Sequence, residues 1–124
     1  MISHFNLGTN DLPRAEAFFD ALLALMNGRQ AFKNERTILY AFSEDGAKIA
    51  INTPHNGQPA TAGNGSMVAL GAADKAQVEA VHAKALELGG SCEGKPGGRM
   101  NDMLYAAYFR DLDGNKFGIF CSTN

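Results

Sequence analysis

The chain has 124 residues and a mass of 13.2 kDa, which is the size of one ordinary domain. Hydrophobic residues make up 45% and charged residues 19%, a composition that excludes a disordered or coiled-coil protein. The net charge of -2 lacks the basic excess of a nucleic-acid binder, and the apolar runs are too short to span a membrane. The two cysteines are too few for a disulfide framework, so we expect reduced thiols in a cytoplasmic protein.

The first part of the chain predicts a strand, an amphipathic helix and three more strands. Residues 2–9 mix polar and apolar side chains as a strand does. An Asn-Asp cap then opens a helix, whose apolar residues recur every three or four positions to about Met26. The further strands are expected at 30–33, 37–42 and 48–53, with a turn at 43–47.

Residues 54–65 are dense in turn-forming residues and predict a connecting segment. The pattern of strand and helix then begins again. The expected elements are a strand at 66–72, a helix at 75–88, a short strand at 91–93, an irregular glycine-rich loop at 94–99, and a hairpin of strands at 103–110 and 116–121.

The two parts of the chain also match residue by residue. Ser3, Leu7, Gly8 and Asp11 recur 63 positions later as Ser66, Leu70, Gly71 and Asp74, and Tyr40, Gly46, Lys48 and Ile51 recur 68 positions later as Tyr108, Gly114, Lys116 and Ile119. Leu23 and Leu25 likewise match Leu86 and Leu88, so the matches fall at caps, helix stripes and turns, which indicates an internal duplication. We therefore expect a single domain over 1–124, with module one at about 1–53, the connecting segment at 54–65 and module two at about 66–124.

Three stretches carry a resemblance to a known family: Ile2-Ser3-His4, Asn10-Asp11-Leu12, and residues 105–116 with their Asp111-Leu112-Asp113-Gly114-Asn115 turn. Together with the two βαβββ modules they resemble the vicinal-oxygen-chelate superfamily, which comprises glyoxalase, bleomycin resistance and dioxygenase proteins. The resemblance implies an α+β fold in which both modules form an open, curved, eight-stranded sheet with a central cleft. It is weak for function, because the same fold hosts lyases, epimerases, dioxygenases, thiol transferases and binding proteins.

Superfamily members that use a metal place one ligand on the first strand and one on the last strand of each module. The matching positions are His4, Ala50, Met67 and Gly118, and of these only His4 can bind a divalent ion of this kind. A stable site needs about three or four ligands. We therefore predict no metal and no other cofactor, with a carboxylate from a partner chain as the alternative.

The expected strand pairing decides which side chains face the predicted cleft. The expected pairs are Phe42 with Lys48 and Tyr40 with Ala50 in the first hairpin, and Arg110 with Lys116 and Tyr108 with Gly118 in the second. A tyrosine then stands beside a small residue in each half. The predicted cleft residues are His4, Asn6, Tyr40, Ala50, Asn52, Met67, Ala69, Arg99, Tyr108, Gly118 and Phe120.

Such a lining, largely apolar and aromatic with a few polar groups, is typical of a small-molecule site. The first hypothesis is thus a metal-free protein that binds a small, partly aromatic organic molecule, and the resemblance adds a homodimer as the expected assembly. The second is a lyase or isomerase of the lactoylglutathione lyase type, using a metal or His4 with Tyr108 as its acid–base pair. The third is a structural or oligomerising domain whose cleft is filled by its own side chains. No nucleic acid or membrane partner is expected.

Overall fold

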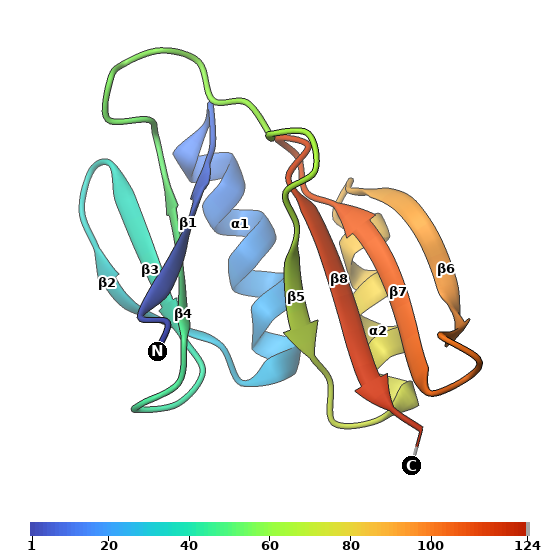
Figure 1. The fold of residues 1–124 in the computed structure, drawn as a ribbon. Helices are drawn as coiled ribbons and strands as arrows, with labels where there is room; N and C mark the ends of the chain where they lie inside the picture. Colours follow the sequence, from blue (N-terminus) through green and yellow to red (C-terminus); the bar gives the residue numbers. More distant parts are fainter. Residues whose placement is uncertain (124) are drawn as a thin grey trace. The chain divides into compact units, whose positions relative to one another are not determined.

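The computed structural model describes residues 1–123 and divides the chain into two compact units (Figure 1). The first unit is Met1–Gly63, and the second begins at Asn64. Each unit contains one α-helix and one four-stranded sheet, so the expected α+β class with two βαβββ modules is confirmed. Neither helix in the described residues has the length and apolar character that crossing a membrane requires.

In the first unit the strands are ordered β1-β4-β3-β2, with β1 parallel to β4 and the other pairs antiparallel. Its elements are β1 (His4–Gly8), α1 (Leu12–Leu23), a short 3-10 helix (Ala24–Met26), β2 (Arg29–Lys33), β3 (Thr37–Ala41) and β4 (Lys48–Asn52).

The sequence explains where α1 begins, where it ends and which face it buries. The Asp11 carboxylate accepts a hydrogen bond from the backbone N–H of Arg14 at 3.1 Å and caps the helix. The short 3-10 helix that follows α1 ends at Asn27, whose φ of 61° lies in the left-handed region. Phe19, from the buried stripe of α1, contacts Tyr40 of β3 with ring centroids 6.2 Å apart. The helix therefore covers one face of this sheet, and we call the other face the first open face.

The second unit repeats this order as β5-β8-β7-β6, with β5 parallel to β8 (Figure 1). Its elements are β5 (Val68–Gly71), α2 (Lys75–Glu87), β6 (Ser91–Arg99), β7 (Leu104–Arg110) and β8 (Lys116–Ser122). The core lies between α2 and one face of the sheet, where Phe109 and Phe117 stack with centroids 5.3 Å apart and Val78 and Val81 of α2 are fully buried. We call the other face the second open face.

The prediction of an irregular loop at 94–99 is wrong, because these residues complete strand β6. The pairing of β6 with β7 shifts register between Cys92 and Gly94 and again between Gly94 and Gly97, which absorbs extra residues as bulges. Glycine at position 94 also allows close packing, since a Cβ there would lie 2.8 Å from Cδ2 of Tyr108. The glycines thus permit a bulged strand beside Tyr108.

Candidate ligand-binding site

Tyr40 does not belong to the predicted site. In the structure Leu39 pairs with Ala50, and Tyr40 pairs with Ile49 on the face that α1 covers. There the hydroxyl of Tyr40 donates a hydrogen bond to the Asp20 carboxylate at 2.7 Å, and the residue is only 1% exposed. Burial, followed by the hydrogen bond to Asp20, raises the pKa of Tyr40 far above its usual value of 10.

The predicted pairing of Tyr40 with Ala50 was wrong because the two hairpins differ in length. Residues 42–47 separate β3 from β4, whereas residues 111–115 separate β7 from β8, so the first connection is one residue longer. A one-residue change of register turns every side chain of a strand to the opposite face. Leu39, which the sequence analysis did not select, therefore occupies the place in the first unit that Tyr108 occupies in the second.

In the second hairpin the structure has the expected pairs, Arg110 with Lys116 and Tyr108 with Gly118. Strand β5 adds Ala69 beside Gly118, and Gly94 of β6 lies beside Tyr108. Because paired residues share a face, these residues all lie on the second open face. The predicted residues that the structure gathers on this face or at its edge are Met67, Ala69, Arg99, Tyr108, Gly118 and Phe120.

Tyr108 is the centre of this group. Its ring meets the ring of Phe120 edge to face, with centroids 5.5 Å apart. The guanidinium of Arg99 lies 5.5 Å and the ammonium of Lys116 lies 5.4 Å from the centroid of the Tyr108 ring. Both distances are within the range of cation–π attraction, about 6 Å. Tyr108 is therefore an aromatic side chain held between a second ring and two positive charges.

The hydroxyl groups of the three tyrosines have different partners. Tyr40 donates to Asp20 of α1, and Tyr105 donates to Glu79 of α2 at 2.6 Å. Among residues 1–123 the Tyr108 hydroxyl has no hydrogen-bond partner. Two tyrosines thus fasten a sheet to its helix, and the third presents an unused donor and acceptor on the second open face.

The charged groups around Tyr108 are only partly compensated. Arg110 forms a salt bridge with Glu93 at 2.7 Å. Arg99 instead donates to the backbone carbonyls of Gly98 at 3.1 Å and Lys95 at 2.9 Å. Next to these side chains is a hollow of about 350 Å³, lined by Asn64, Gly65, Ser66, Met67, Arg110 and Lys116. Lys116 lines this hollow and also lies over the Tyr108 ring, so it is the residue that the hollow and the ring share.

Lys116 and Arg110 were not among the predicted site residues, although the sequence contains the signal. The pair Arg110–Lys116 was expected, and residues two positions apart on a strand project from the same face. Lys116 must therefore share a face with Gly118, and Arg110 with Tyr108.

The ligand positions expected for a superfamily metal do not fit a metal in this chain. A Cβ at Gly118 would be too close to Cε1 of Phe120 and only 3.3 Å from Sδ of Met67, so ring and thioether fill the space where a carboxylate side chain would start. Ala50 is buried and has no donor atom. Within residues 1–123 no group of three or more His, Cys, Asp or Glu side chains could hold a metal ion.

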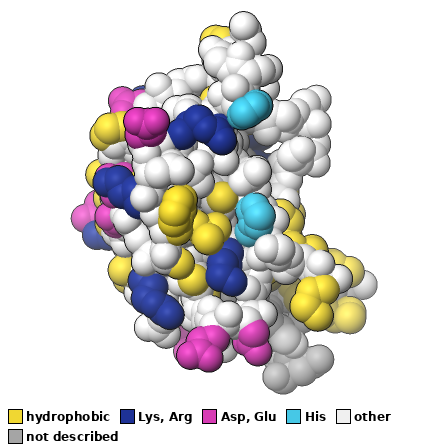
Figure 2. All heavy atoms as spheres, turned by 90° about the vertical axis from the view of Figure 1, so that its left-hand side faces the viewer, with side chains coloured by type: hydrophobic (Ala, Val, Ile, Leu, Met, Phe, Trp, Pro, Cys, Tyr) yellow, Lys and Arg dark blue, Asp and Glu magenta, His cyan; other side chains and the backbone are white. Residues whose placement is uncertain are grey.

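The first open face carries the remaining predicted residues. His4 is exposed, and its Nδ1 lies 3.1 Å from the Ser3 hydroxyl. Asn52 donates a hydrogen bond to the side-chain oxygen of Asn6 at 3.3 Å. Across the sheet, Asn6, Ala50, Leu39 and Phe32 follow one another through the strand pairing, and Phe32 is 53% exposed. Figure 2 shows apolar side chains in the middle of this side of the molecule, with Lys, Arg, His, Asp and Glu side chains around them.

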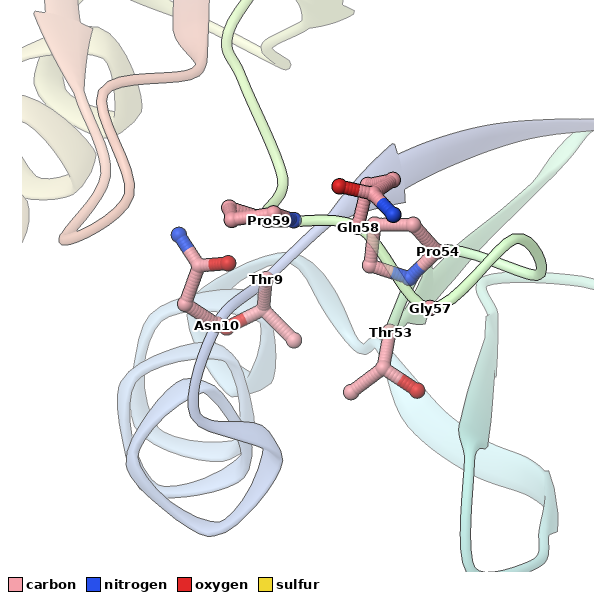
Figure 3. Close-up of a pocket in the computed structure, with 7 residues that line it drawn as sticks. All are labelled: Thr9, Asn10, Thr53, Pro54, Gly57, Gln58 and Pro59. Carbon is pink, nitrogen blue, oxygen red and sulfur yellow. The ribbon is translucent and has the colours of Figure 1, made fainter.

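A second hollow, of about 290 Å³, lies within the first unit between the start of α1 and the segment that follows β4 (Figure 3). Its lining is uncharged: Thr9, Asn10, Thr53, Pro54, Gly57, Gln58 and Pro59. The amide of Asn10 already accepts from the N–H of Ala60 at 2.7 Å and donates to its carbonyl at 3.3 Å. This hollow therefore lacks the charge and the aromatic surface that distinguish the second open face.

Comparison with known proteins agrees with this fold. The family described as the Glyoxalase/Bleomycin resistance protein/Dioxygenase superfamily matches residues 1–119. The chain belongs to this superfamily, as its sequence resemblance implied. No curated protein matches the chain.

Among solved structures, the chain is similar to a glyoxalase/bleomycin resistance protein from Albidiferax ferrireducens T118, with 41% identity, a TM-score of 0.88 and coverage of 98% of both chains. A glyoxalase-related enzyme from Fulvimarina pelagi has 18% identity and a TM-score of 0.80, with 98% of this chain and 88% of that chain covered. The fosfomycin resistance protein FosX from Mesorhizobium loti has 18% identity and a TM-score of 0.70, with 99% and 92% covered. The last two show the fold alone.

Proposed function

We propose that this protein binds a small, partly aromatic organic molecule on the second open face and that it does so without a metal ion. The observation that carries the proposal is the environment of Tyr108. Its hydroxyl has no partner among residues 1–123, and its ring lies against Phe120 and two cations on a sheet face that α2 does not cover. Tyr40 and Tyr105 use their hydroxyls to bond a helix, whereas the Tyr108 hydroxyl is available to a bound molecule.

The surroundings of Tyr108 suit a ring-containing ligand. Each favourable aromatic pair contributes about 0.5–1.5 kcal/mol beyond the area it buries. Met67 is 42% exposed beside Gly118, and its flexible thioether adapts to ligands of different shape. The missing side chain at Gly118 lets the Phe120 ring and the Met67 thioether lie against the backbone of β8, where both can contact a flat molecule.

Amide resonances of isotope-labelled protein provide the test. We expect ring-containing fragments, both charged and neutral, to shift the resonances of Gly94, Tyr108 and Gly118. The Tyr108→Leu variant is expected to lose this response. The matched control is Tyr105→Leu, which removes a tyrosine from the opposite face of the same strand and is expected to keep it. A broad fragment library that leaves these resonances unchanged would overturn the proposal.

Two further parts of the proposal have separate measurements. Elemental analysis of the purified protein is expected to find no stoichiometric zinc, nickel, iron or manganese, and one equivalent of a tightly held ion would contradict it. The homodimer is expected because two-module members of the family often pair. Sedimentation velocity over a range of protein concentrations is expected to show a dimer, and a monomer at all concentrations would contradict it.

A further inference from the structure

The second open face holds more positive than negative charge. Arg99, Arg110 and Lys116 lie around Tyr108 and its hollow, and Glu93 is paired with Arg110. Arg99 and Lys116 form no salt bridge within residues 1–123. The whole chain has a net charge of -2, so this concentration of cations is a local feature of one sheet face.

One of these cations, Arg99, is also held in position before any ligand arrives. The guanidinium of Arg99 donates hydrogen bonds to two backbone carbonyls of β6. The Tyr108 ring, whose centroid lies 5.5 Å away, further restricts its movement. Lys116 lies opposite Arg110 in the hairpin, lines the hollow, and has its ammonium 5.4 Å from the centroid of the same ring. Charges ordered in advance lose less entropy on binding and favour recognition of an opposite charge.

We infer that the molecule bound on this face is an aromatic acid, with its ring beside Tyr108 and Phe120 and its carboxylate hydrogen-bonded to Lys116, while the charge of Arg99 adds to the attraction. This inference rests on the proposed function and names its ligand class. A cationic ligand would meet like charge at this face. A neutral ring would cover the ammonium of Lys116 without supplying an acceptor, and an unsatisfied charge is costly to remove from water. A carboxylate supplies the acceptor that the ammonium of Lys116 lacks and leaves the rings for the apolar part.

A matched pair of probes tests this assignment: 2-naphthoate and its neutral analogue 2-naphthamide. We expect naphthoate to bind about tenfold more tightly than naphthamide, because a hydrogen bond to a charged group is worth roughly a factor of ten or more. The Lys116→Gln variant is expected to weaken naphthoate about tenfold and naphthamide less than twofold. The Arg99→Gln, Lys116→Gln double variant is expected to bind acid and amide equally.

The control variant is Lys84→Gln, which makes the same change of charge on α2 of the same unit, where Lys84 pairs with Glu87 at 3.4 Å. It is expected to bind naphthoate as the native protein does, and all variants are first compared by circular dichroism. If naphthamide binds as well as naphthoate and both depend on Tyr108, the acid assignment is overturned while the proposed function stands. If neither probe nor any library fragment shifts the resonances of the second open face, both fail together.

Discussion

Replacement of Gly118 by alanine tests the packing of the candidate site directly. Gly118 does not have a left-handed backbone, so alanine is sterically allowed by the main chain and would by itself stabilise strand β8 by about 0.5–1 kcal/mol. The new Cβ would, however, lie 3.0 Å from Cζ of Phe120 and 3.3 Å from Sδ of Met67. Forcing an extra methyl into packed surroundings typically costs about 1–3 kcal/mol. We therefore expect Gly118→Ala to destabilise the protein by about 1–2 kcal/mol.

Urea unfolding followed by circular dichroism measures this change. The Phe120→Ala variant removes the obstructing ring, so adding Gly118→Ala in that background is expected to be neutral or stabilising. The difference between the two backgrounds, about 2 kcal/mol, is the coupling energy of the two positions. Gly71→Ala is the matched control, because a Cβ at Gly71 meets nothing within 4 Å. Equal effects of Gly118→Ala in both backgrounds would refute the packing described here.

Three other predictions concern the two cores. Tyr40→Phe removes the hydrogen bond to Asp20 and is expected to lower the free energy of unfolding by about 1 kcal/mol in urea titrations, and no change would contradict a stabilising bond. Burial lowers the pKa of His82 below its usual 6.5. The free energy of unfolding is therefore unaffected by His82 above about pH 6.5 and falls as the pH drops from there toward the pKa of His82 in the folded protein. His82→Leu is expected to remove that part of the pH dependence in urea titrations. Asp111→Ala leaves two backbone N–H groups and the Asn115 amide without their acceptor, and is expected to cost about 1–3 kcal/mol by thermal or urea unfolding.

Local signals in the sequence were sufficient for most of the fold. The caps at Asp11 and Asp74 and the apolar stripe that follows each of them were enough to predict both helices, because each signal acts within a few residues. The second hairpin was also predicted in register, since the Asp111 side chain bonds two backbone N–H groups and closes a turn of defined length.

The errors arose where strand register depends on features that a local residue pattern does not contain, such as the length of the connection between two strands. Tyr40 and Tyr108 match in the internal alignment, yet an extra residue in the first connection places Tyr40 on the helix-covered face. The bulges of β6 are a similar case, because glycines that suit a loop also suit a strand packed closely on Tyr108. Lys116 is a different case: in the sequence it served only to set the expected hairpin register, although its place two residues from Gly118 puts both residues on one face.

The contrast among the three tyrosines has an optical consequence. The chain has no tryptophan, so its ultraviolet emission comes from tyrosine. A phenol that donates to a carboxylate, as Tyr40 and Tyr105 do, transfers its proton in the excited state and emits weakly. Most native fluorescence should then originate from Tyr108, which gives the protein a built-in reporter at one defined surface without any added label.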